Sequence, residues 1–542
     1  MNRSASGRAR IDKAASAAFL ALAAAAFARL LFAGKIGAEG MGYVSAGLEL
    51  CALFLALLMQ TPSMVTASLV RGRMARGHAL SAHRLMKTAL FSMTGAGVVC
   101  GLLCVMLSPL LARLFFKSPL SFLAVLCAGP GVCCSGALGV ARGYFQGVRY
   151  TAVAIHSYVL QAALCAAGGT AGGALAYSYG EKAAALLRDA RYAAAYGAAG
   201  VTAGVSLGLL LTLLYLGAVY LMTRRSLARQ WENGDEKYGE ESRGALRRSF
   251  FSMLLPILLT VLFQNLVLLC DARIFFGSAL ENENVYADWG AFYGKALPLV
   301  QGAAFLLLLP MTGLIGALAR EWGRGNLPNY RTRFGVTLRL SLYLAAPEAF
   351  FLIAAGTLWP QALFGAADGT TALLLAVTGI GVVLLHGAGA ATLLLLRSDS
   401  SLLTAAAAMT AFVLQASLLL VLRSFAGMGV LAAALSWLAF FLLYLLLLAF
   451  LGQKRLCFRL RWLSDLLRIA LCAAIAAAPV YLLCAPLSKA IGALPTLLIA
   501  AALYAVIYIF LSLFTGAADL YHIDRLPGGA LLVKLAKVMR LR

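Results

Sequence analysis

Long apolar runs separated by short polar segments dominate the pattern along the chain. About 20 consecutive apolar residues form a helix long enough to cross a bilayer. Fourteen runs of this kind can be drawn, at residues 14–34, 44–70, 88–112, 120–141, 151–176, 195–222, 251–276, 289–318, 336–358, 370–396, 401–422, 429–451, 466–485 and 492–515. The pattern therefore predicts an all-α polytopic membrane protein with about fourteen transmembrane helices.

The composition agrees with lipid as the solvent. Of 542 residues, 62% are hydrophobic and only 12% are charged, whereas soluble domains carry about 25% charged residues. The net charge of +24 suggests nucleic-acid binding until the charges are placed on a topology. With the amino terminus inside, most of the 45 Lys and Arg residues fall in cytoplasmic segments, as the positive-inside rule requires. The charge thus predicts orientation, with both termini cytoplasmic, and excludes a nucleic-acid partner.

The longest interior hydrophilic stretch, "TRRSLARQWENGDEKYGEESRGALRRS" at 223–249, divides the apolar runs into two sets of six. Two further runs follow. We therefore expect six segments: a basic amino terminus at 1–13, a first lobe at 14–222, a linker at 223–249, a second lobe at 250–452, two added helices at 453–515, and a basic amphipathic tail at 516–542.

An internal repeat supports this division. "MQTPSMVTASLVRGRMARG" contains Pro62, and "LLLPMTGLIGALAREWGRG" contains Pro310, 248 residues later. In both segments an Arg-Gly pair begins fourteen residues after the proline. Because each half holds an even number of helices, the halves run parallel. The sequence therefore predicts two six-helix lobes related by a parallel pseudo-repeat, plus two C-terminal helices.

Motifs for covalent chemistry are absent from the sequence. It contains no P-loop, no GxGxxG after a strand, no HExxH and no GxSxG. Its eleven cysteines lie mostly inside apolar runs without zinc-like spacing. We expect free thiols, no metal site, no cofactor and no enzymatic activity.

Ionisable residues inside membrane spans normally face a bundle interior or a wet pathway for substrates or ions. The cations are Arg29, Arg273 and Lys295, and the acids are Glu49, Asp271 and Glu348. Other interpretations remain open, since Asp271 and Arg273 can pair with each other, Lys295 can extend to the interface, and Glu348 can pair with a neighbouring helix.

Three prolines inside apolar runs are expected to bend helices. They are Pro62, Pro310 and Pro347. Alternating-access carriers flex at such bends, so these residues are candidates for gating.

Four segments together resemble a known family. They are "ARLLFAGKIGAEGMGYVSAGLEL", "ARGYFQGVRYTAVAIHSYVLQ", "AFYGKALPLVQGAAFLLLLPMTGLIGALAREWGRGN" and "GMGVLAAALSWLAFFLLYLLLLAFLGQ". In this order and at these helix numbers they resemble the polysaccharide flippase branch of the multidrug/oligosaccharidyl-lipid/polysaccharide (MOP) superfamily. That branch includes stage V sporulation protein B and the lipid II flippases.

The resemblance implies a fold and a set of roles. It implies two lobes around a central cavity with alternating access, and a groove for a lipid tail formed by the last two helices. In this branch, basic residues of the first, second and eighth helices hold a pyrophosphate. Arg29 fits the first helix and Lys295 the eighth, whereas the second span, 44–70, carries no Lys or Arg.

The function that follows from these observations is transport. We expect a flippase of the bacterial cytoplasmic membrane that translocates an undecaprenyl-pyrophosphate-linked sugar, such as lipid II or another cell-wall or exopolysaccharide precursor. Arg29, Arg273 and Lys295 would contact the pyrophosphate, while Glu49, Asp271 and Glu348 serve H⁺ or Na⁺ coupling or charge pairing. The alternatives are a cation-coupled multidrug exporter of the same superfamily and a non-transporting membrane scaffold in wall or spore assembly.

Overall fold

The computed structural model describes residues 12–232, 241–278, 284–396, 400–456 and 462–517. Most of the basic amino terminus, the middle of the 223–249 linker and nearly all of the amphipathic tail at 516–542 lie outside the described residues. Helices make up all regular structure in the described ranges, with no strand among them.

The chain separates into two compact units. The first, here called the amino-terminal unit, comprises Phe27–Gly294 and Ala408–Trp437. The second, the carboxy-terminal unit, comprises Met1–Ala26, Lys295–Ala407 and Leu438–Arg542. Helices α1, α15 and α16 and the π-helix η3 contribute residues to both units. The predicted segment boundaries at 223 and 249 are not tested by this partition and stay a prediction.

The amino-terminal unit contains the helices up to the middle of the chain and parts of two later ones. Its elements are α1 (Lys13–Leu55), η1 (Ala56–Gln60), α2 (Thr61–Ala75), α3 (Ala79–Met106), α4 (Ser108–Phe116), η2 (Pro119–Ser121), α5 (Phe122–Gly147), α6 (Thr151–Leu187), α7 (Arg191–Glu232), α8 (Arg243–Gly277), α9 (Val285–Gly290), η3 (Ala291–Ala296), α15 (Ser401–Ser424) and α16 (Val430–Leu456). Of these, η1 and η3 are π-helical and η2 is a 3₁₀ turn.

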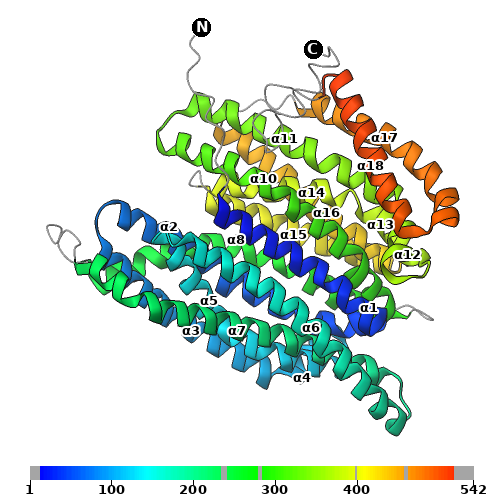
Figure 1. The fold of residues 1–542 in the computed structure, drawn as a ribbon, viewed down its shortest axis with the longest axis horizontal. Helices are drawn as coiled ribbons and strands as arrows, with labels where there is room; N and C mark the ends of the chain where they lie inside the picture. Colours follow the sequence, from blue (N-terminus) through cyan, green and yellow to red (C-terminus); the bar gives the residue numbers. More distant parts are fainter. Residues whose placement is uncertain (1–11, 233–240, 279–283, 397–399, 457–461, 518–542) are drawn as a thin grey trace. The chain divides into compact units, whose positions relative to one another are not determined.

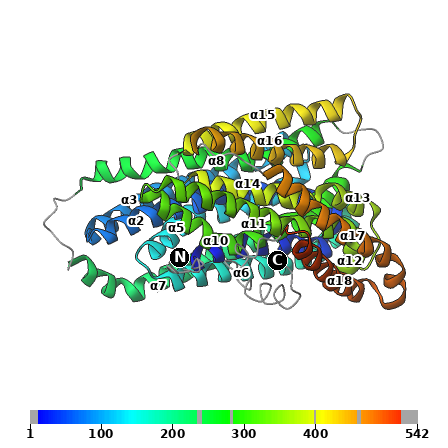
Figure 2. The ribbon, with the colours of Figure 1, turned by 90° about the horizontal axis from the view of Figure 1, so that it is seen from above.

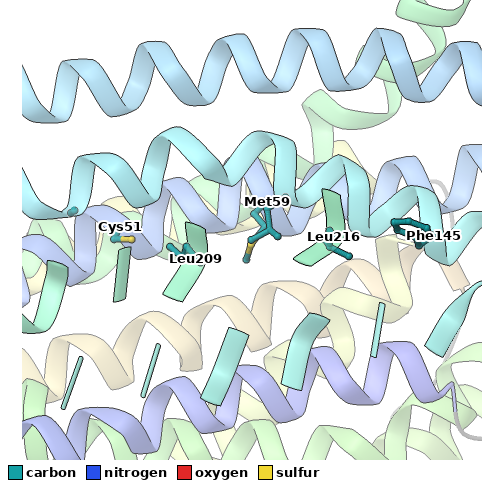
Figure 3. Packing of buried hydrophobic residues seen from close by; sticks show 7 residues of the cluster. Cys51, Met59, Phe145, Leu209 and Leu216 are labelled. Atoms are coloured by element: carbon teal, nitrogen blue, oxygen red, sulfur yellow. The ribbon is translucent and has the colours of Figure 1, made fainter. Parts of the chain in front are cut away.

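Helix packing in this unit depends on small residues. Helices α6 and α7 lie side by side (Figure 1). A Cβ atom at Gly204 would lie only 2.0 Å from the carbonyl oxygen of Gly168, so the two backbones meet directly. Around the neighbouring α5, buried residues from α1, η1, α5 and α7 form a continuous apolar core, which Figure 3 shows from Cys51 and Met59 to Leu216 and Phe145.

The carboxy-terminal unit contains the remaining helices. They are α10 (Leu297–Gly323), α11 (Leu327–Ala354), α12 (Leu358–Phe364), α13 (Gly369–Thr378), α14 (Gly381–Leu396), α17 (Trp462–Ile491) and α18 (Ala493–Phe514). Helices α17 and α18 pair with each other in both views (Figures 1 and 2). Both also contact α11. The two predicted C-terminal helices therefore pack on the predicted ninth span.

The internal repeat reappears in the helix boundaries. Helix α3 runs over Ala79–Met106 and α11 over Leu327–Ala354, so both ends differ by the 248 residues that the sequence repeat predicts. Each helix follows a glycine with positive φ, 84° at Gly77 and 70° at Gly325, a conformation that ends the preceding helix. The short helices α4 and α12 also end 248 residues apart, at Phe116 and Phe364.

The number of candidate spans is close to the fourteen predicted. Twelve helices in the described ranges are long and apolar enough to cross a membrane, or thirteen if α13 and α14, bent by 42°, form one span. The run Lys13–Ala75 has 63 residues, about three times the length needed for one crossing. It covers two predicted spans, and its helix breaks at Gly37, whose φ of 70° and ψ of −179° are not helical.

Some predicted span boundaries are wrong. The span at 88–112 ends at Met106, because Ser108 and Pro109 begin the separate helix α4. The spans at 151–176 and 195–222 are parts of longer helices, α6 with 37 residues and α7 with 42. Hydropathy marks where the apolar stretch stops, whereas Glu, Lys and Ala continue a helix beyond it.

Candidate functional site

Arg29 lies in a polar cluster of the amino-terminal unit. Its guanidinium carbon stands 4.8 Å from the centre of the Tyr293 ring, and Nη1 donates to the Tyr293 carbonyl oxygen at 3.5 Å. Tyr293 belongs to η3 and interacts with Glu49, on which the charge of Arg29 also acts. Arg29 and Glu49 are 8% and 7% exposed. In this conformation Arg29 therefore lies against an aromatic ring, with Glu49 in the same buried cluster.

The helices that carry this cluster approach unusually closely. A Cβ atom at Gly290 of α9 would lie 1.7 Å from the Ala38 carbonyl oxygen of α1. Nearby, the rings of Tyr43 and Tyr286 stack at 4.7 Å, and Trp289 Nε1 donates to Ser45 Oγ at 3.1 Å. The segment after Gly37 is thus packed tightly against α9, with no room for a side chain at Gly290.

Lys295 lies in η3 and takes part in an ion pair of the carboxy-terminal unit. Its Nζ donates to Asp368 Oδ2 at 2.8 Å and lies 5.1 Å from the centre of the Phe364 ring. The side chains of Lys295 and Asp368 are 15% and 25% exposed. The ammonium does not simply extend toward the interface, since it has a specific counter-charge.

Asp368 lies in the turn between α12 and α13 and holds two partners. Its Oδ1 accepts from Thr371 N at 3.1 Å, which caps α13, and its Oδ2 accepts from Thr371 Oγ1 at 2.7 Å as well as from Lys295. Burial alone would raise the pKa of Asp368, but the hydrogen bonds from Lys295 and Thr371 outweigh burial and lower this pKa below its ordinary value.

Asp271 is fully buried in the amino-terminal unit. Its Oδ1 accepts from Gln415 Nε2 of α15 and from Ser436 Oγ of α16, the latter at 3.4 Å. Its Oδ2 and the Gln415 Oε1 have no hydrogen-bond partner among the described residues. Two unpartnered oxygens from two helices thus lie in one buried cluster.

Two predicted site residues take part in no ion pair among the described residues. Arg273, on the same helix as Asp271, is half-buried and does not pair with it; its Nη1 lies near Gly277 at the end of α8. Glu348 is exposed on α11. The structure therefore brings Arg29 and Glu49 together, whereas Lys295, Asp271, Arg273 and Glu348 have separate surroundings.

The three predicted prolines all lie in or next to helices. Pro62 occupies the first turn of α2, directly after the π-helix η1. Pro310 and Pro347 lie inside α10 and α11. A proline inside a helix removes one backbone hydrogen bond, so α10 and α11 each carry a weak point at these positions.

Arg142 is a buried cation that the sequence did not single out. It is 1% exposed in α5, and its guanidinium donates to Ser157 Oγ at 2.9 Å, to the Ser157 carbonyl at 3.2 Å and to Gln161 Oε1 at 2.8 Å. It also stacks 4.0 Å from the Tyr158 ring. Neutral acceptors on α6 therefore hold this charge in place. The sequence signal that could have placed Arg142 inside a helix is the apolar and glycine pattern of "GVARGYFQG", which continues past the predicted boundary at 141.

Arg423 near the end of α15 was likewise expected in a loop. It is 2% exposed and donates to the carbonyl oxygens of Phe275 at 3.3 Å, Ser278 at 2.7 Å and Met428 at 3.0 Å. Phe275 and Ser278 lie at and just after the end of α8, where backbone carbonyls are not fully satisfied by the helix itself. Arg423 thus serves as a capping residue.

Among the described residues, no group of three or more His, Cys, Asp or Glu side chains is arranged to hold a metal ion. No family model and no curated protein matches the chain. Solved structures do match it.

A multidrug-resistance MATE family transporter of the MOP superfamily, in an inward-facing conformation, matches with a TM-score of 0.60 and 13% identity over 81% of this chain and 94% of its own. The lipid II flippase MurJ, in an inward closed conformation, matches with a TM-score of 0.59 and 14% identity over 92% of this chain and 97% of its own. A eukaryotic MATE transporter matches with a TM-score of 0.57 and 12% identity over 86% and 97%.

The chain has the fold of the MOP-superfamily transporters. This confirms the predicted polytopic all-α fold class. The TM-scores to the drug transporter and to the flippase differ by only 0.01, so the MOP fold by itself does not separate these two activities.

Proposed function

We propose that the protein is a flippase that moves an undecaprenyl-pyrophosphate-linked sugar across the bacterial cytoplasmic membrane by alternating access. The observation that carries this proposal is the pair Lys295–Asp368. A lysine inside a predicted membrane span is costly unless a counter-charge is present, and here the partner carboxylate is itself 25% exposed. A diphosphate that enters the site would offer Lys295 a stronger anionic acceptor than the Asp368 carboxylate.

Arg29 supports the same interpretation. A guanidinium can bind two phosphate oxygens at once, and in this conformation its partners are the Tyr293 ring and the nearby Glu49. Lys295 and Arg29 therefore each lie against groups of the protein that a bound diphosphate would displace. Arg273, which has no ion-pair partner among the described residues, is the third proposed contact.

The two added helices also favour a lipid carrier. The flippase structure covers 92% of this chain, and the two MATE transporters cover 81% and 86%. In the family branch that the sequence resembles, the last two helices accommodate a lipid tail, and α17 and α18 are the corresponding helices of this chain.

The Asp271 cluster is the proposed site of ion coupling. Asp271 Oδ2 and Gln415 Oε1 lack partners among the described residues, and buried oxygens without donors are costly. A proton on Asp271 or a Na⁺ ion between the two oxygens would satisfy them. Binding there would link α8, α15 and α16, and would supply a driving force without nucleotide hydrolysis.

The test is the amount of lipid-linked precursor that reaches the outer leaflet in cells depleted of their own lipid II flippase. Expression of the protein should restore it, and Lys295→Ala and Arg29→Ala should not. Arg324→Ala is the matched control, because the Arg324 side chain is 72% exposed at the end of α10. Failure of the wild-type protein to restore outer-leaflet precursor would refute the lipid II version.

The second candidate, a cation-coupled multidrug exporter, is favoured by the match to a multidrug-resistance transporter and by the buried acid Asp271. The same variants distinguish it. A drug exporter should retain drug resistance in Arg29→Ala and lose it in Asp271→Asn. A non-transporting scaffold should retain its activity when Arg29, Arg273 and Lys295 are all neutralised.

A further inference from the structure

Pro347 leaves one carbonyl of α11 without its helical partner. In an α-helix the N–H of each residue donates to the carbonyl four residues earlier. Proline has no N–H, so the carbonyl oxygen of Tyr343 cannot be satisfied from position 347. Tyr343 is only 6% exposed, and a buried unpaired carbonyl is unfavourable.

A hydroxyl from α18 satisfies this carbonyl. Tyr508 Oη donates to the Tyr343 carbonyl oxygen at 2.9 Å. Tyr508 is 5% exposed, and its ring lies 5.5 Å from the Tyr343 ring. The tyrosine of one helix thus replaces the backbone donor that proline removed from another.

The contact is part of a longer stripe of contacts, in which one row of side chains on α18 meets one row on α11. On α18, Tyr504, Tyr508 and Ser512 are spaced four residues apart, so they share one face. They contact Tyr343 and Phe351 of α11, which flank Pro347 at the same spacing. Ser512 Oγ donates to the Ile509 carbonyl at 2.9 Å and is 3.1 Å from Tyr343 Oη, so the Tyr343 hydroxyl is the donor to Ser512.

The flanking aromatic contact extends the stripe by one more turn. The rings of Phe351 and Tyr504 lie 5.5 Å apart, and those of Tyr504 and Tyr508 are nearly parallel at 6.3 Å. Pro347 therefore lies at the centre of the α18 contact, between two turns of α11 that α18 touches.

The repeat shows that this arrangement belongs to one half of the chain only. Subtracting 248 places Gly95 and Val99 of α3 at the positions of Tyr343 and Pro347. Helix α3 contains no proline, and Val99 is 57% exposed. Of the two repeated helices, only α11 lacks a backbone donor at this position, and α11 is the helix to which α18 supplies a hydroxyl in its place.

We propose that Tyr508 is a positioning residue. Its hydroxyl stabilises α11 at Pro347, so that a displacement of α18 changes the backbone conformation of α11 at this position. If the proposed flippase function is correct, a lipid tail at α17 and α18 changes the conformation of α11 through this hydroxyl. The two added helices then act on the transport cycle as well as contact lipid.

A double-mutant cycle on the purified full-length protein tests the contact itself. Tyr508→Phe should lower the melting temperature by a few degrees, because the Tyr343 carbonyl loses its donor. In the Pro347→Ala background, the new N–H of residue 347 serves that carbonyl, so Tyr508→Phe should cost much less. An equal loss in both backgrounds, or no loss in the wild type, would overturn the proposal.

Tyr504→Phe is the matched control. The Tyr504 hydroxyl donates to the Ala473 carbonyl of α17 at 3.2 Å, and Ala477, four residues later, keeps its N–H. Its removal should therefore lower the melting temperature less than Tyr508→Phe, and by the same amount in the wild-type and Pro347→Ala backgrounds. A Tyr504→Phe effect that also vanishes in Pro347→Ala would contradict the assignment to Tyr508.

Transport of a lipid-linked diphosphate in proteoliposomes tests the functional part. Tyr508→Phe should lower the maximal rate several-fold with the half-saturating concentration unchanged, and Tyr504→Phe should keep the wild-type rate. A wild-type rate in Tyr508→Phe would overturn the role in transport. If the wild-type protein moves no such lipid, the flippase function fails, and the stability cycle still decides whether Tyr508 supports α11.

Discussion

Lys295 and Asp368 form a 2.8 Å ion pair across 73 residues of sequence. The same carboxylate caps α13 through Oδ1, which accepts from Thr371 N, while Oδ2 accepts from both Lys295 and Thr371 Oγ1. One oxygen maintains the start of a helix, and the other holds a charge that the proposed substrate would compete for. Lys295 can therefore exchange its partner while Oδ1 continues to cap α13.

Asp368→Asn should release Lys295 and keep the cap, because asparagine is an equally good capping residue. A partly exposed ion pair contributes about 0.2–1 kcal/mol, so the Kd for a pyrophosphate-bearing lipid should fall by up to about fivefold. Binding to the purified protein in detergent checks this. Lys295→Ala in the Asp368→Asn background should abolish the gain, and an unchanged Kd in Asp368→Asn would refute the competition.

Arg29 and Glu49 should depend on each other for stability. Arg29→Ala removes the cation that acts on the Glu49 carboxylate, so this buried charge becomes less favourable and the protein should unfold at a lower temperature. Adding Glu49→Gln removes that charge, and it should recover most of the loss while leaving transport absent. Thermal unfolding of the single and double variants measures the coupling. Strictly additive losses would show that the two side chains do not act on each other.

Asp271→Asn should abolish the response of transport to an ion gradient. The asparagine side chain keeps an oxygen for Gln415 and Ser436 but holds neither a proton nor a sodium ion well. Initial rates in proteoliposomes with imposed Na⁺ or pH gradients provide the measurement. The wild-type rate should rise with one of the two gradients, and the Asp271→Asn rate with neither. A variant that still responds to the gradient would place coupling elsewhere.

Gly290→Ala should separate α1 from α9. The new methyl group would overlap the Ala38 carbonyl oxygen, and overpacking of this kind costs about 1–3 kcal/mol. The melting temperature should fall, and the Trp289 environment should change with it. Gly34→Ala is the control, because a Cβ there meets nothing within 4 Å. Equal effects from both substitutions would contradict the close contact.

Much of the architecture was predictable because hydropathy, proline and glycine act locally. The apolar runs predicted the helices, and the Pro62 and Pro310 segments predicted a repeat that returns in the ends of α3 and α11. Gly77 and Gly325, the glycines of the repeated Arg-Gly pair, both adopt positive φ. These features need no knowledge of contacts between distant residues.

The partners of the polar residues were not predictable in the same way. Asp368 lies 73 residues from Lys295, and Gln415 lies 144 residues from Asp271, so no spacing rule connects them. Arg142 was assigned to a loop because the apolar run stops at 141, although α5 continues to Gly147. Local patterns locate a charge along a helix, whereas tertiary packing decides which group neutralises it.

Helices α6 and α7 have 37 and 42 residues, which correspond to about 55 and 63 Å at 1.5 Å per residue. The hydrocarbon core of a bilayer is only about 30 Å thick. A peptide tag inserted in the turn at residues 188–190, which joins these helices, would therefore lie outside the hydrocarbon core. Antibody access to that tag in intact cells would reveal whether this turn faces the outside, as a cytoplasmic amino terminus requires.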